Sequence, residues 1–432
     1  MTARKHQKAR VRARMAHTGE RYAAARAHVV PGARPPDESP VHSAGRGTNP
    51  AANALRRIVA ETGVDLGEPL ALILGGGAGI GVFQFHYAKE GFSSLFLAGR
   101  HAWDDDLAFI DGALRRLGLE PVVTETTSAR VADRQLREAL GNGQPVIAWV
   151  DAAELRTRGY PAEYRGGAYH VVVVHALDDA RGVAVLDDLS DAPVEVPIET
   201  LARARARIAK FRNRLLQLPA DARPPTDEVV RDATHSGLDA MHAGLDHPRT
   251  RNFGLAALED WSTRLRGTGK EAWPTVFPPG PRLWSGLASI HQYVEHYGSG
   301  GGLLRPLVAA GLREAGARVG DPRLVEVAAR YDELGARWRD LAMAALPDDV
   351  PALRRTRELQ DRRARLYVER GPEAAADIDA AWSESDVIRA ATADDFPFDE
   401  ATTKSLLARL AELVDSLHDG EVAALGALPA AR

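Results

Sequence analysis

The sequence contains no cysteine, which excludes disulfide bonds, thiolate metal sites and a cysteine nucleophile, whatever the fold. It also contains no uninterrupted apolar run of roughly 18 residues or more, the length that a membrane-spanning helix needs. The first residues, MTARKHQKARVRARMAH, lack the apolar stretch of a secretory signal. We therefore expect a cytoplasmic protein.

A strong net charge is absent as well. The 55 Lys and Arg residues and 59 Asp and Glu residues leave a formal charge of −4, which argues against a surface covered by nucleic acid. The 45% hydrophobic and 26% charged residues are ordinary for a globular protein. Because one core rarely serves more than about 250–300 residues, the 432-residue chain predicts two domains.

The first 30 residues form a distinct basic arm with one acid, Glu20. The arm either contacts nucleic acid or an acidic partner, or is a solvated terminus. The stretch PGARPPDESP at 31–40 follows as a linker, and we assign residues 1–36 to the arm and linker. The basic residues of the arm are Arg4, Lys5, Lys8, Arg10, Arg12, Arg14, Arg21 and Arg26.

From residue 37 to about 220 the pattern mixes helices and strands, and from 221 to 432 only helical patterns follow. The first part begins with a helix at 49–63 that Asn49 caps, and an apolar run at 70–74 that we read as a strand. We expect further strands at 94–100, 120–126, 144–151 and in a hairpin at 169–188, and helices at 105–119 and 132–143. Without a fixed-period repeat, the second part predicts a helical bundle.

The glycine loop GGGAGIG at 75–81 is typical of the phosphate-binding turn of NAD(P)-dependent short-chain dehydrogenases. Such enzymes need a tyrosine and a lysine spaced Y-x-x-x-K, and the candidate stretch YPAEYR at 160–165 has no lysine. The segment at 82–92 is aromatic and strand-like, so it provides no helix dipole for a phosphate. A dehydrogenase is the third alternative among the functions considered below.

The strongest local feature is the run YHVVVVHALDD, a buried strand with His170 and His175 near its ends. The chain turns back at 178–182 and the returning strand ends at Asp187 and Asp188. Antiparallel pairing brings one of these carboxylates beside His170, and a register slip of one residue decides which. A base and its orienting acid are assembled in this way. A core histidine beside two solvated acids is the alternative.

Several motifs together resemble the butirosin-biosynthesis H N-terminal domain family of papain-like acyltransferases, and the resemblance covers about residues 40–350. The motifs are Gly63, Glu68, LGGGAG, AGR, GQPVIAWVD, YHVVVVHALDD and VLDD, then YGSGGGLLRPLVAAGLREA and WRDLA in the helical part. The resemblance implies an α+β fold, with a papain-like domain at 37–220 and an all-α domain at 221–432. It implies His170 as the base, Asp187 as the orienting acid with Asp188 as the alternative, and Gly75, Gly76, Gly77 and Gly79 as a loop whose amides face an oxyanion.

In that family a cysteine opens the first helix, and an ungapped count places Pro50 there. Proline has no reactive group, so the simplest alignment predicts a pseudoenzyme. A small shift brings Thr48 to the position and a larger one brings Ser43, and either hydroxyl needs His170 to remove its proton during attack. The alternative for each residue is a role without catalysis: Thr48 helps to cap the helix, and Ser43 is a polar residue of a flexible segment before it.

Our first functional hypothesis is transfer of an acyl or aminoacyl group from an acyl carrier protein thioester to a small amine, in specialised metabolism. The second is a catalytically inactive scaffold on the same fold, and a homodimer stays open. We expect no cofactor and no metal: His291 and His296 are five residues apart, which is not the spacing of one α-helical turn. The glycines at 298–302 either admit a phosphate or pantetheine arm or break a helix, and we favour the break.

Overall fold

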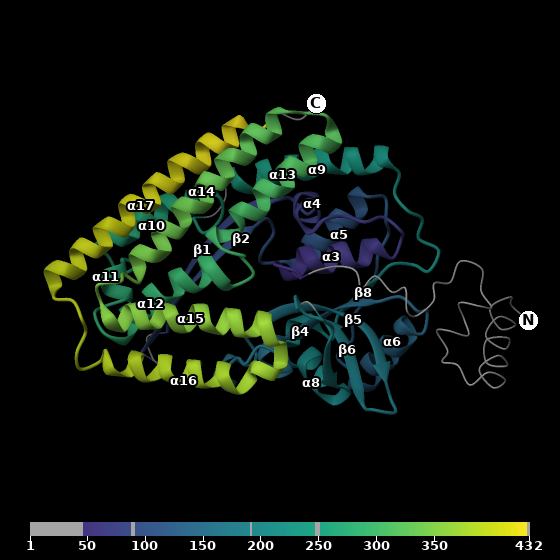
Figure 1. The fold of residues 1–432 in the computed structure, drawn as a ribbon, viewed down its shortest axis with the longest axis horizontal. Coiled ribbons are helices and arrows are strands. Elements are labelled where there is room, and N and C mark those ends of the chain that lie inside the picture. Colours follow the sequence, from purple (N-terminus) through teal and green to yellow (C-terminus); the bar gives the residue numbers. More distant parts are fainter. Residues whose placement is uncertain (1–45, 88–90, 191, 247–250, 430–432) are drawn as a thin grey trace, which may run out of the picture.

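The computed structural model describes residues 46–87, 91–190, 192–246 and 251–429 (Figure 1). A β-containing N-terminal part is followed by a helical C-terminal part, as the sequence predicts. The papain-like assignment stays a prediction. The basic arm and linker at 1–36, and Ser43, lie outside the described residues.

The N-terminal part is built on an antiparallel six-stranded sheet. The two central strands, at residues 146–151 and 169–178, are rich in β-branched residues, and their paired segments are buried on both faces. This pattern is typical of a sheet that helices cover on both sides. Helix α3 (Pro50–Ala60) packs on one face, and α6 (Ala129–Leu140) and α8 (Ile198–Arg207) pack on the other. The strands, in sheet order, are β3 (Val122–Thr124), β8 (Leu215–Gln217), β4 (Val146–Asp151), β5 (Tyr169–Asp178), β6 (Val183–Asp187) and β7 (Val194–Pro197).

The apolar run at 70–74 is part of a helix, α4 (Glu68–Leu74), so the strand predicted there is wrong. Pro69 occupies the first turn, where its missing N–H costs nothing, and every residue of the helix except Pro69 is buried. A short and fully buried run shows no periodicity that separates a strand from a helix. After α4 the chain forms a two-stranded antiparallel hairpin, β1 (Ala78–Tyr87) with β2 (Phe92–Arg100), and then α5 (Asp106–Arg116).

The topology contradicts the dehydrogenase alternative. A dinucleotide-binding fold needs parallel strands and a helix directly after the glycine loop. Here a helix precedes the loop, a strand follows it, and every strand pair in the described part of the chain is antiparallel.

The C-terminal part is helical over its described length, and no helix there or elsewhere in the described residues has the length and apolarity to span a bilayer. Its core is continuous with that of the N-terminal part, because one cluster of buried side chains runs from α3 and α4 to α14 and α17. The helices are α9 (Asp227–Leu245), α10 (Leu255–Arg266), α11 (Trp273–Val276), α12 (Pro281–His291), α13 (Arg305–Val319), α14 (Arg323–Ala345), α15 (Pro351–Arg370), α16 (Ala375–Ala391) and α17 (Glu400–Ala427).

Arg305 ties the two parts together at the first residue of α13. Its guanidinium is fully buried and donates to the backbone oxygens of Gly79 at 3.1 Å and Gly99 at 3.0 Å, in the β1–β2 hairpin. Its Nε pairs at 2.7 Å with Glu421, which lies on α17 and is also fully buried. The hairpin is therefore held against the C-terminal helices by polar contacts as well as by the shared core.

Candidate functional site

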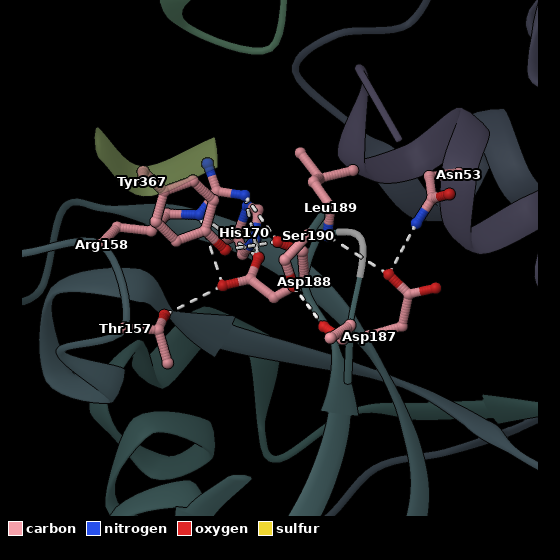
Figure 2. A network of polar contacts seen from close by, with 10 residues as sticks. Asn53, Thr157, Arg158, His170, Asp187, Asp188, Leu189, Ser190 and Tyr367 are labelled. Atoms are coloured by element: carbon pink, nitrogen blue, oxygen red, sulfur yellow. Dashed lines mark hydrogen bonds and ion pairs between the residues drawn. The ribbon is translucent and has the colours of Figure 1, made fainter. Parts of the chain in front are cut away.

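His170 lies near the start of β5, and its Nε2 is 2.6 Å from the Oδ1 atom of Asp188 (Figure 2). Asp188 follows directly after β6, so the hairpin brings an imidazole and a carboxylate together as the sequence predicts. Both side chains are nearly inaccessible, at 7% and 0% exposure. Among the described residues, no hydroxyl group makes a hydrogen bond with His170, whose side-chain bond is to Asp188.

The contact is made by Asp188, the alternative, and not by Asp187. A bulge in β5 at His175 explains the difference: Ala176 pairs with Val185, but Val174 pairs with Leu186. Paired residues point to the same face of a sheet, so the shift puts Asp187 opposite Val173 and leaves Asp188 on the face of His170. An unbulged hairpin would place Asp187 on that face instead.

Asp188 is held by three further side chains. The hydroxyl of Thr157 donates to its Oδ2 at 2.9 Å, and Arg158 donates to its Oδ1 at 3.0 Å. The hydroxyl of Tyr367, on α15, donates to its backbone oxygen. Burial by itself disfavours the charged carboxylate, but Arg158 and His170 outweigh burial and hold the pKa of Asp188 well below its usual range. Asp188 is therefore a carboxylate anion placed to orient His170.

Asp187 has a structural environment. Its carboxylate pairs with the buried Arg57 and accepts hydrogen bonds from Asn53 and from the N–H of Leu189, each at 3.2 Å. Figure 2 shows its side chain directed towards Asn53 and away from the group around Asp188. Since both Asn53 and Arg57 lie on α3, Asp187 joins the end of β6 to that helix.

Helix α3 begins as predicted, with Asn49 as its N-cap and Pro50 as its first residue. The Asn49 side chain accepts from the N–H of Ala52 at 3.2 Å. The N–H groups of Thr48 and Asn49 donate to the carboxylate of Glu68, at 2.9 and 2.6 Å. Burial raises the pKa of Glu68 above its usual value, and these two N–H groups offset only part of that rise. The backbone at the position expected for a nucleophile is thus fixed, but the first helical residue is inert.

The glycine loop does not form the predicted oxyanion site. The N–H groups of Gly75, Gly76 and Gly77 donate to the carbonyls of Ala71, Ile73 and Leu72, and so they terminate α4. Gly79 packs against the backbone of Arg100. None of the four glycines lines the cavity described next. The positive φ angles of Gly76 and Gly77 allow the chain to end α4, and these glycines do not form the oxyanion-binding loop that was predicted.

A cavity of about 830 Å³ lies between the sheet, the β1–β2 hairpin and the C-terminal helices, and His170 is in its wall. Its lining is rich in aromatic rings, which come from every side. Trp103 packs on Phe83 with ring centroids 4.9 Å apart, and Tyr293 packs on Phe96 at 4.8 Å. Such a wall suits an organic acyl chain, with His170 as a polar group at its edge.

Gly298 and Gly300 line this cavity too, and they pack against the start of α3. A Cβ atom at Gly300 would lie 2.4 Å from Cγ2 of Thr48, and the carbonyl of Gly298 accepts from the Asn49 side chain at 3.1 Å. The loop breaks the helix, as predicted, and it also closes over the position where a nucleophile was expected. Thr48 and Pro50 both line the cavity beside it.

Sequence reasoning missed the residues that hold Asp188 and those that close the cavity from the C-terminal part. Thr157 and Arg158 lie in a short loop after α7 (Ala152–Leu155), and nothing in their spacing links them to residue 188. Tyr367 and Trp382, from α15 and α16, also line the cavity. Tyr160 lines it as well.

Two family models match consecutive stretches of the chain. Residues 49–189 match the family described as butirosin biosynthesis protein H, N-terminal, and residues 199–393 match a domain of unknown function, DUF4872. A search of the curated proteins finds no match. The first match spans α3, the hairpin β5–β6 and both members of the His170–Asp188 pair. Residues 49–189 therefore form a domain of the butirosin biosynthesis protein H N-terminal family, and a DUF4872 domain follows it.

Proposed function

We propose that the protein transfers an acyl or aminoacyl group from a carrier-protein thioester directly to a small amine, with His170 as the general base. The family indicates a biosynthetic protein of acyltransferase type. The observation that carries the proposal is the ionised Asp188 bound to His170 in the wall of an aromatic cavity. Papain-like architecture is part of the same proposal.

A direct transfer needs no nucleophile from the protein. His170 takes a proton from the acceptor amine as its nitrogen attacks the thioester carbonyl. The C–N bond forms, the C–S bond breaks, and the departing thiolate receives the proton from the imidazolium. A thioester suits this route because its thiolate leaves readily. Two observations favour direct transfer over a route through an acyl-enzyme. The first residue of α3 is Pro50, and no hydroxyl of the described residues is bonded to His170.

The charge on the cavity wall supports a carrier-borne donor. Arg46, Lys210 and Arg214 all line it. Arg214 pairs with Glu125 at 2.8 Å, but the ammonium of Lys210 lies 4.1 Å from the ring centroid of Tyr169 and pairs with no carboxylate of the described chain. A free cation at the wall would attract the phosphate of a pantetheine arm.

The test is to incubate the protein with acylated carrier proteins and a panel of amines, and to detect amide products by mass spectrometry. We expect amide formation with the wild type and a loss of about 100-fold or more in His170→Ala. The control is His242→Ala, which removes an exposed histidine on α9 that does not line the cavity. Intact mass should show no acyl adduct on the protein. An adduct on Thr48 or Ser43 would contradict direct transfer.

A binding scaffold without catalysis is the second candidate, and Pro50 is the observation that favours it. It predicts that the acylated carrier binds without amide formation for any amine, and that His170→Ala binds as the wild type does. Turnover that depends on His170 would rule it out.

A further inference from the structure

A second cluster of chemically active side chains lies on the C-terminal helices. His291 is the last residue of α12, His296 ends the next turn, and Asp361 lies on α15. Their ligand atoms all lie within 4.8 Å of one another. The Nε2 atom of His296 is 2.8 Å from Oδ1 of Asp361, and that of His291 is 3.8 Å from the same atom.

The expectation that a spacing of five residues keeps the two histidines apart is wrong, because residues 292–296 form a π-helical turn. A π-turn bonds residue i to i+5, so side chains five apart lie on the same side of it. The two imidazole rings accordingly lie with centroids 5.3 Å apart. π-helical turns are rare, and they are frequent at functional sites.

Gln360 orients His291 towards Asp361. The Nδ1 atom of His291 is 2.6 Å from Oε1 of Gln360, and Nε2 of Gln360 donates to the backbone oxygen of Ala288 at 3.0 Å. The second bond fixes the amide with its oxygen towards the imidazole, so Nδ1 carries the proton and donates it. The Nε2 atom is left with its lone pair directed at Asp361. Metal-binding histidines are held in the same way by a partner on their other nitrogen.

The arrangement also leaves room for an ion. Ligands of a tetrahedral Zn²⁺ with bonds of about 2.0–2.1 Å lie about 3.3 Å apart. The two distances to Asp361, 2.8 and 3.8 Å, lie on either side of that value. A shift of about 0.5 Å by Asp361 from one histidine towards the other equalises these two distances, and the ligand atoms of the two histidines lie within 4.8 Å of each other. Its side chain is 46% exposed, so such a shift disturbs no packed core.

We propose that His291, His296 and Asp361 bind a divalent transition-metal ion, with Zn²⁺ as the ion that best fits two imidazoles and a carboxylate. Of the three ligands, His296 lines the large cavity, so the site adjoins the cavity at that residue. Three protein ligands and one open position are the pattern of a site that binds an exchangeable group. The site is separate from the His170–Asp188 pair and does not depend on the acyltransferase proposal.

The test titrates Co²⁺ into the chelator-treated full-length protein, follows the visible absorption of the bound ion, and then adds Zn²⁺ in competition. We expect saturable absorption at one ion per chain, displaced by Zn²⁺ and lost in His296→Ala and in Asp361→Asn. Gln360→Met should keep the site but weaken it by about 10–100-fold.

His418→Ala is the matched control. It removes another histidine beside carboxylates, with Glu259 at 3.3 Å and Asp419 at 3.4 Å, and should bind Co²⁺ as the wild type does. Circular dichroism confirms that each variant is folded. No absorption with the wild type, or unchanged binding by the folded His296→Ala and Asp361→Asn proteins, would overturn the proposal.

Discussion

The buried pair between Arg305 and Glu421 allows a quantitative test of how the two parts of the chain are joined. Arg305→Met keeps much of the side-chain volume and removes the charge. It leaves the carboxylate of Glu421 with one remaining donor, the indole N–H of Trp338 at 3.1 Å. It also removes the donors from the backbone oxygens of Gly79, Gly99 and Leu303.

The expected cost is large because neither charge reaches water. Both side chains are 0% exposed, and removing one partner of a buried pair destabilises a protein by about 3–5 kcal/mol. The pair of Arg266 with Asp415 provides a control, since its distance is also 2.7 Å but its side chains are 42% and 51% exposed. An exposed pair contributes about 0–1 kcal/mol, so Arg266→Met should cost at most about 1 kcal/mol.

The assay is equilibrium unfolding in urea, followed by far-UV circular dichroism, for both variants and for Arg305→Met combined with Glu421→Gln. We expect the double variant to recover part of the loss, because the carboxylate left without its partner is removed. A loss in Arg305→Met no larger than that in Arg266→Met would refute the view that Arg305 joins the hairpin to the C-terminal helices.

Three further outcomes are expected. Asp188→Asn should slow acyl transfer about 10²–10⁴-fold. Asp187→Asn should cost about 3 kcal/mol of stability and leave the transfer rate of the folded protein unchanged. Equal transfer rates in the two variants would contradict the assignment of Asp188 as the acid that orients His170. Burial raises the pKa of Glu68 above 4.5, so its stabilisation is present at low pH and is lost as pH rises through the raised value. Glu68→Gln should therefore gain stability relative to the wild type from pH 4.5 towards neutrality, and a constant difference in urea unfolding would refute this. Gly300→Ala forces a Cβ atom against Thr48 at positive φ, and a thermal shift should report a loss of about 1–3 kcal/mol.

Much of the fold could be predicted from the sequence because helix caps and strands depend on residues that are close together in the chain. The cap at Asn49 and the ring of Pro50 start α3, and the β-branched run before His175 forms the central strand. The absence of cysteine settled, without any structure, that no thiol does chemistry here. The strand predicted at 70–74 failed because a short run buried on all sides carries no periodicity.

The sequence by itself predicted that a histidine and an acid could meet across the β5–β6 hairpin, since the pairing of adjacent strands follows from the local pattern of residues. Only the tertiary structure decided that the acid is Asp188, because a single bulged residue reverses the faces of all residues beyond it. The tertiary structure also brings Arg158 and Tyr367 to that acid, through contacts between residues 30 and 179 positions apart that no local sequence pattern predicts. It places His291 beside His296 through a π-helical turn, which the α-helical periodicity of the sequence does not indicate.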